Sequence, residues 1–137
     1  MPYLTKQYKF CAAHRYWNPN WSDEKNYQVF GDDVRIHGHN YILDITIFGP
    51  INNDSGFIVN LFELNELIKL HILDVMDHSQ IQLDIPWFNS KQPSTENMVV
   101  FIWEKIVSKI PIPAKLYSIK LRETPTIFTE YFGLEGK

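Results

Sequence analysis

The sequence predicts an α+β fold, because segments with strand patterns and segments with helical patterns occur in separate blocks along the chain. Their order is β-β-α-α-β-β. Strands that are separated from helices in this way favour an antiparallel sheet with the two helices on one face. Hydrophobic residues make up 45% of the 137 residues, which is enough for one compact core. We therefore expect a single domain over residues 1–137.

Two strands are expected in the first third of the chain. Residues 8–14 are compatible with a strand, although the two alanines before His14 are poor strand formers. Residues 37–48 contain the clearest strand, since apolar side chains at positions 41, 43, 45 and 47 alternate with polar ones at 44 and 46. The turn-rich sequence at 52–56, followed by the apolar run at 57–59, then predicts a short hairpin.

Residues 15–31 predict a long loop that is rich in aromatic side chains. Tryptophans and tyrosines are mixed there with Asn-Pro-Asn and Ser-Asp-Glu sequences, which are typical of turns. Loops of this length in a small domain usually bind or cover something. An aromatic loop can also form a satellite core or a contact between subunits, and both interpretations stay open.

Two helices are expected in the middle of the chain. Leucines and isoleucines recur at helical spacing over residues 61–73. The second helix spans residues 98–110, with a Ser-Thr pair before it as a source of an N-cap and Pro111 after it. Its first six residues are apolar on all sides, which indicates burial against more than one neighbour and hints at an oligomer. Residues 117–123 and 126–131 supply the last two strands.

The composition argues against several classes of function and location. A formal net charge of −3 with scattered basic residues argues against nucleic-acid binding. The longest unbroken apolar stretch has six residues, against about 20 for a membrane-spanning helix, and the N-terminus lacks the apolar region of a signal peptide. The one cysteine, Cys11, cannot form an internal disulfide, which fits a reducing compartment. We therefore expect a cytoplasmic protein with no nucleic-acid or membrane partner.

The tripeptide His37-Gly38-His39 is the sharpest candidate for a metal site. In an extended strand, residues two apart point to the same side, so both imidazoles can reach one ion. His14 ends the preceding strand and can meet them across a sheet. Three histidines with an open fourth position are typical of catalytic metal sites. The alternative is a pair of partly exposed histidines that share no ligand.

Asp77-His78 and two glutamates are further candidates, each with an ordinary alternative. Adjacent residues do not face each other on a helix or strand, so a catalytic Asp77-His78 pair requires a turn. Without one, His78 is simply stabilised by a helix C-terminus. Glu96 suits the first turn of a helix. Glu123 lies where an apolar strand face ends, and it could recognise the paired N–H and NH₂ groups of a guanidine-like ring.

Taken in order, six short motifs resemble those of one known family. They are FCAAH at 10–14, HGHNY at 37–41, GFIVNL at 56–61, DH at 77–78, STEN at 94–97 and RET at 122–124. Together they span nearly the whole chain. The chain is similar to the 6-pyruvoyl-tetrahydropterin synthase family, which includes the 6-carboxytetrahydropterin synthases of queuosine biosynthesis. The resemblance implies the tunnelling fold, in which protomers form a hexamer of two trimers with active sites at protomer contacts.

The resemblance also implies a role for each matching residue. The zinc ligands would be His14, His37 and His39. The proton-handling pair would be Asp77 and His78. The pterin pocket would be lined by Thr95, Glu96 and Glu123, with Glu123 anchoring the ring. The implied substrate is 7,8-dihydroneopterin triphosphate, and Zn²⁺ would act as a Lewis acid toward its side-chain hydroxyls.

One position departs from the family pattern. The family's usual catalytic base is a cysteine a few residues before the HGH motif, and the matching position here is Asp33. Cys11 has the opposite strand parity to His14, so it should point away from the metal as a packing residue. Some members that lack the cysteine carry a glutamate three residues before the motif, where this chain has Val34, and these members cleave the substrate to 6-hydroxymethyl-7,8-dihydropterin.

Three hypotheses for function follow from this departure. The leading one is a zinc-dependent 6-pyruvoyl- or 6-carboxytetrahydropterin synthase. The second is side-chain cleavage with Asp33 as the base, because a carboxylate is a weaker base than a thiolate toward a proton on carbon. The third is a pterin-binding paralogue that has lost turnover.

Overall fold

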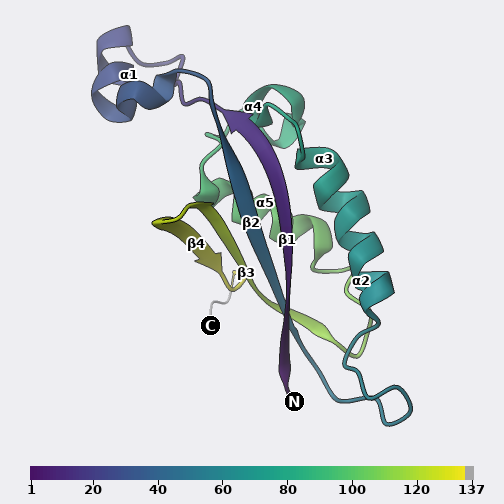
Figure 1. Ribbon diagram of the computed structural model, residues 1–137. Helices are drawn as coiled ribbons and strands as arrows, with labels where there is room; N and C mark the ends of the chain where they lie inside the picture. The colour runs from purple at the N-terminus through teal and green to yellow at the C-terminus, as the bar shows by residue number, and fades with distance from the viewer. Residues whose placement is uncertain (135–137) are drawn as a thin grey trace.

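The computed structural model of the chain describes residues 1–134, and four antiparallel strands form its sheet (Figure 1). In spatial order the strands are β1 (Tyr3–His14), β2 (His37–Phe48), β3 (Lys115–Thr124) and β4 (Ile127–Tyr131). β1 and β2 pair from Tyr3 opposite Phe48 to His14 opposite His37. β1 therefore begins five residues earlier than predicted, because β2 is long enough to pair with the additional residues.

Helices cover one face of this sheet (Figure 1). They are α2 (Leu61–Ile68), which continues through the π-helical segment η2 (Lys69–Leu73) into α3 (Asp74–Met76), then α4 (Ile81–Asp84), η3 (Pro86–Phe88) and α5 (Thr95–Ile106). The α+β prediction is confirmed. Within residues 1–134, no helix is both long and apolar enough to cross a membrane.

The ends of α5 are set by local hydrogen bonds. Ser94 is its N-cap, with Oγ accepting from the N–H of Asn97, as the sequence predicts. The helix ends at Ile106 and not at residue 110. After Ile106 the chain tightens, and the N–H of Lys109 donates to the carbonyl of Ile106.

The hydrophobic core lies between the sheet and the helices. Positions 41, 43, 45 and 47 of β2 are fully buried, and they belong to one cluster with Leu64 and Ile68 of α2. Met98, Phe101 and Ile102 of α5 are buried in the same cluster. One chain therefore buries most of the apolar start of α5, and this helix does not by itself require a partner subunit.

The expected long loop at 15–31 contains a helix, α1 (Asp23–Phe30), followed by the turn η1 (Gly31–Val34). Ser22 caps α1 by accepting from the N–H of Lys25. Asn26 is fully buried, and its side-chain amide bonds to both the N–H and the carbonyl of Asn18. The Ser-Asp-Glu sequence is thus the start of a helix and not only turn chemistry.

The expected hairpin at 57–59 is also wrong. These residues form no strand, and the turn is closed by the N–H of Asn52 donating to the carbonyl of Phe57. Ile58 and Val59 are 9% and 6% exposed, so their apolar character reflects packing into the core. A short apolar run does not distinguish a strand from a buried loop.

A hydrogen bond between Tyr8 of β1 and Asn65 of α2 joins the sheet to the helical layer, with 2.8 Å between Tyr8 Oη and Asn65 Oδ1. Burial raises the pKa of Tyr8 to about 12, so its hydroxyl remains a donor. We predict that Tyr8→Phe lowers the free energy of unfolding by about 1 kcal/mol, because Asn65 Oδ1 loses its donor. Urea denaturation measures the change. Tyr3→Phe, on the exposed end of the same strand, is the control, and it should stay within about 0.5 kcal/mol of the parent; equal losses in both variants would contradict the assignment.

Candidate active site

Three histidines meet at one end of the sheet. His14 is the last residue of β1 and pairs with His37 at the start of β2. The ring centroids of His14, His37 and His39 are 4.5 to 5.1 Å apart. One nitrogen from each ring lies within 4.8 Å of the others. The sheet register thus brings together the three residues that the sequence selected, in a group that could hold a metal ion.

Backbone carbonyls orient two of these rings. His14 Nδ1 lies 2.7 Å from the carbonyl oxygen of Pro93, and His37 Nδ1 lies 2.8 Å from that of Arg35. A carbonyl can only accept, so each Nδ1 carries the proton and each Nε2 keeps a free lone pair. Within residues 1–134, the buried Nε2 atoms of His14 and His39 have no aligned hydrogen-bond partner. Unpaired buried nitrogens that converge in this way fit a metal ion.

Glu123, at the end of β3, borders the histidines. Its Oε1 atom lies 3.2 Å from His14 Nε2 and 3.3 Å from His39 Nε2. The contact with His14 holds the pKa of Glu123 below its usual range, although burial opposes this. Burial disfavours the charged form of His39 and so lowers the pKa of its imidazole. The arrangement places an ionised carboxylate within ion-pair distance of the His14 and His39 rings.

Tyr16 is a residue of this site that the sequence reasoning missed. Its ring centroid is 5.0 Å from that of His14. Burial raises the pKa of Tyr16, and the negative charges of Glu123, Asp33 and Glu96 raise it further. The charges of these three acids therefore act on one aromatic side chain. Its position two residues after His14, on the same parity, is the signal that could have identified it.

The remaining candidates on this side come from two elements, η1 and α5. Asp33 lies in η1, with Oδ1 3.8 Å from His37 Nε2 and a side chain that is 60% exposed. Thr95 is buried at the start of α5, where its Oγ1 lies 2.8 Å from Thr129 Oγ1 of β4 and donates to Glu96 Oε1. Pro93, just before α5, contacts His14 directly. The start of α5 therefore borders the histidine cluster.

Asp77 and His78 follow α3 and are held against the outer edge of β1. The N–H of His78 donates to the carbonyl of Cys11, and the N–H of Ala13 donates to the carbonyl of Ser79. His78 has a φ of 63°, a left-handed conformation that costs a non-glycine residue about 1–3 kcal/mol. The turn that a dyad requires is therefore present, and adjacent residues can face each other there.

The Asp77 carboxylate is fixed on both sides. Oδ1 accepts from the N–H of Cys11 at 2.9 Å, and Oδ2 lies 2.9 Å from His78 Nδ1. The bond from the Cys11 backbone, assisted by His78, holds the pKa of Asp77 below its usual range. Asp77 is thus an ionised group that orients His78 Nδ1–H and leaves Nε2 exposed for proton exchange.

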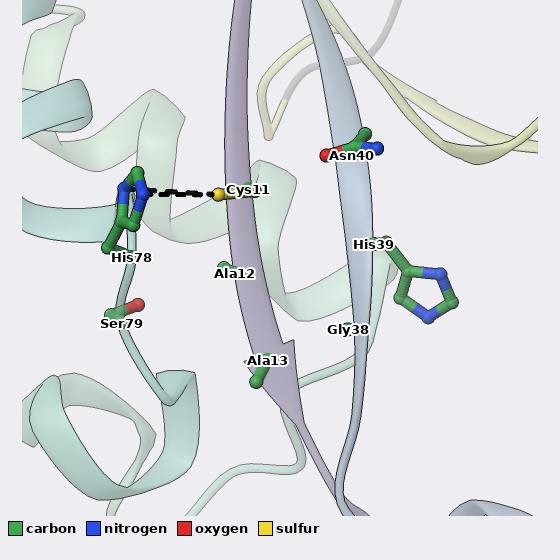
Figure 2. A pocket seen from close by; sticks show the side chains of 8 residues that line it. All are labelled: Cys11, Ala12, Ala13, Gly38, His39, Asn40, His78 and Ser79. Carbon is green, nitrogen blue, oxygen red and sulfur yellow. Dashed lines mark hydrogen bonds between the residues drawn. The ribbon is translucent and has the colours of Figure 1, made fainter.

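The dyad and the histidine cluster lie on different sides of the sheet. Even positions of β1 face the core together with His14, whereas Cys11 has the opposite parity. Figure 2 shows His78 beside Cys11 at the edge of β1, with the His39 ring pointing away from them. Cys11 points away from the histidines, as predicted, but it contacts His78 and is not merely a packing residue.

Known proteins share this fold and sequence. Residues 3–133 match the family model described as 6-pyruvoyl tetrahydropterin synthase. The chain belongs to this family. A 6-pyruvoyl tetrahydrobiopterin synthase of Drosophila melanogaster is 38% identical over 133 residues, which cover 96% of this chain and 79% of the relative. Members of the family are pterin synthases, and the sheet with its helices is the tunnelling fold.

Solved structures agree with this assignment. The 6-pyruvoyl tetrahydropterin synthase of Caenorhabditis elegans superposes with a TM-score of 0.87 at 31% identity and covers 97% of both chains. A 6-pyruvoyltetrahydropterin synthase of Plasmodium vivax has a TM-score of 0.66 at 16% identity and covers 95% of this chain and 96% of that one. The Plasmodium structure carries alanine in place of a glutamate that is its catalytic residue. At that identity it shows the shared fold alone.

Proposed function

We propose that this chain is a zinc-dependent lyase that acts on 7,8-dihydroneopterin triphosphate. The observation that carries the proposal is the convergence of His14, His37 and His39 beside the carboxylate of Glu123. Nitrogen ligands in this number suit Zn²⁺ in a catalytic site, because the fourth position stays open for substrate. When bound, zinc supplies a Lewis acid that stabilises negative charge on a side-chain hydroxyl oxygen of the substrate.

Glu123 is the proposed anchor for the pterin ring. Its lowered pKa keeps it ionised at neutral pH, so both oxygens can accept hydrogen bonds. The N–H and NH₂ edge of a pterin offers two parallel donors, which a carboxylate binds in a forked arrangement. Thr95 and Glu96 border the same site from α5 and add polar contacts. This binding orients the side chain of the substrate toward the three histidines.

Asp77 and His78 are proposed to move protons during the reaction. Asp77 holds His78 Nδ1, which leaves Nε2 to accept or donate a proton. Because this pair lies across the sheet from the histidines of its own chain, it is placed to serve a different copy. We therefore propose a homo-oligomer, a hexamer, whose active sites combine the histidine cluster of one protomer with the dyad of another.

The leading candidate reaction is synthesis of a 6-pyruvoyl- or 6-carboxytetrahydropterin. Asp33 supports a second candidate reaction, side-chain cleavage to 6-hydroxymethyl-7,8-dihydropterin. Its carboxylate lies 3.8 Å from His37 Nε2, close to where a substrate hydroxyl would sit. A carboxylate is a weak base for a proton on carbon, with an ordinary pKa of about 3.9 against about 8.5 for a thiol. An acidified hydroxyl gives up its proton more readily, and loss of that proton starts retro-aldol cleavage. The catalytic glutamate of the Plasmodium vivax relative is a precedent for a carboxylate in this fold.

The central test is incubation of zinc-loaded protein with 7,8-dihydroneopterin triphosphate, followed by mass analysis of the pterin product. We expect about one zinc per chain at the histidine cluster and turnover to a lyase product. His37→Ala and His39→Ala should lose zinc and turnover together, because each removes a ligand. His71→Ala, which changes a histidine outside the cluster, is the matched control and should lose neither. Tight pterin binding without any product would instead identify a non-catalytic paralogue.

Asp33 is tested by comparing the products of the parent, Asp33→Ala and Asp33→Cys. If Asp33 is the base of side-chain cleavage, the parent releases mainly 6-hydroxymethyl-7,8-dihydropterin, and Asp33→Ala loses about 10²–10⁴-fold in rate, the usual contribution of a general base. Asp33→Cys should shift the product toward the 6-pyruvoyl compound, because a thiolate is the stronger base. Efficient 6-pyruvoyl or 6-carboxy formation that persists in Asp33→Ala would show that Asp33 is a bystander.

The shared active site is tested by complementation between inactive variants. His37→Ala lacks the proposed metal site and His78→Ala lacks the proton-handling residue, so each alone should be inactive. When the two chains are refolded together in equal amounts, about a quarter of the interfacial sites combine intact contributions, and about that share of activity should return. Light scattering gives the assembly mass. A monomeric mass at micromolar concentration, or no recovery in mixed assemblies, would contradict the shared site.

A further inference from the structure

A second group of metal-binding side chains lies at the outer edge of β1. One ligand atom from each of Cys11, Asp77 and His78 lies within 4.8 Å of the others. The group borders a pocket of about 330 Å³ that is also lined by Ala13, Asn40 and Ser79 (Figure 2). The Asp77 and His78 side chains are 39% and 79% exposed, so an ion can reach them from solvent. The proposed reaction does not use the thiol of Cys11.

The distance between sulfur and nitrogen matches that of a shared metal ion. Cys11 Sγ lies 3.7 Å from His78 Nε2 and 3.8 Å from His78 Nδ1, so the sulfur faces the imidazole ring and makes no strong hydrogen bond to one nitrogen. Zinc binds sulfur at about 2.3 Å and imidazole nitrogen at about 2.0–2.1 Å, so this separation corresponds to a sulfur–zinc–nitrogen angle of about 115°, close to tetrahedral. The separation of the two atoms therefore suits one ion, and the Cys11 side chain must rotate to bring the sulfur into line with the Nε2 lone pair.

Asp77 occupies the supporting position behind the histidine. Its Oδ2 atom lies 2.9 Å from His78 Nδ1, and its Oδ1 accepts from the N–H of Cys11. A carboxylate that holds the far nitrogen of an imidazole fixes the ring and increases its strength as a ligand. The Cys11 backbone also accepts from the N–H of His78, so the sulfur and the imidazole are attached to one rigid unit.

We propose that Cys11 and His78, oriented by Asp77, form a second metal site that selects thiolate-binding divalent ions such as Zn²⁺. Two protein ligands and water complete the shell, so the site binds more weakly than the three histidines do. The thiol releases its proton to solvent as the ion binds. A soft ligand of this kind excludes Mg²⁺ and Ca²⁺, which prefer oxygen.

Occupation of this site has a consequence that rests on the proposed function. An ion on His78 Nε2 removes the lone pair that would accept a proton, and it adds positive charge beside the dyad. Excess zinc therefore inhibits turnover, whereas the zinc at the three histidines supports it. Metal binding to Cys11 and His78 is tested independently of this inhibition, because binding needs no substrate.

Binding is tested by titrating the full-length chain with Cd²⁺ and recording the ultraviolet thiolate-to-cadmium charge-transfer band. The chain has one cysteine, so this band reports Cys11 alone. We expect the band in the parent and in His37→Ala, no band in Cys11→Ser, and a midpoint at least about tenfold higher in His78→Ala. Asp77→Asn should weaken binding about 10–100-fold. His71→Ala is the control histidine and should match the parent. A band with the same midpoint in the parent and in His78→Ala would overturn the site, as would no band in the parent.

The inhibitory arm compares turnover at rising Zn²⁺ in the parent and in Cys11→Ser. We expect half-inhibition at about tenfold more zinc in Cys11→Ser, since that variant lacks the soft ligand. Equal inhibition of both proteins would overturn the inhibitory role while leaving the cadmium result intact. If no variant turns over substrate, the proposed function fails and the cadmium titration still decides the site.

Discussion

The antiparallel register between β1 and β2 positions the chemistry of this protein. Because His14 lies opposite His37, and side chains two apart share a face, the register alone puts three imidazoles within reach of one ion. A shift of one residue would turn His14 to the other face of the sheet and leave two histidines without a third. The same register buries the odd positions 41–47 of β2 in the core, so the packing that stabilises the sheet also holds the site in place.

The outer edge of β1 also makes hydrogen bonds, to the segment after α3. As an end strand of the sheet it has free backbone groups on one side, and Cys11 and Ala13 use them to hold the segment after α3 through three hydrogen bonds. This attachment forces His78 into its left-handed conformation and brings Asp77 behind it. One strand therefore contributes the buried His14 to the cluster on its inner face and holds an exposed dyad at its outer edge. The separation explains why two copies of the chain are needed in the site that we propose.

Burial and charge are balanced at the histidine cluster. His14 is fully buried, and a buried polar ring without partners would be costly. Its Nδ1 instead donates to a backbone carbonyl, and the carboxylate of Glu123 faces its Nε2. Tyr16 and Tyr41 close the site with aromatic surface, and burial raises the pKa of both hydroxyls. The result is an orientated group of imidazole nitrogens beside one carboxylate, which favours electrostatic interaction with a bound ligand.

The sequence alone determined the fold class, the β2 strand, the two main helices and the identity of the three histidines. The strand, the helices and the His37-Gly38-His39 motif follow from short-range periodicity and spacing, which depend on residues close together in the chain. His14 was selected because it ends the preceding predicted strand. The α1 helix was missed although Ser22 is an ordinary N-cap, because its apolar pattern is weak and aromatic residues obscured it. Only the tertiary structure decided that Glu123, Asp33 and Tyr16 converge on the histidines, that α5 is buried within its own chain, and that Cys11 contacts His78. These depend on contacts between residues far apart in the chain, and a linear pattern of polar and apolar residues does not specify which distant side chains meet.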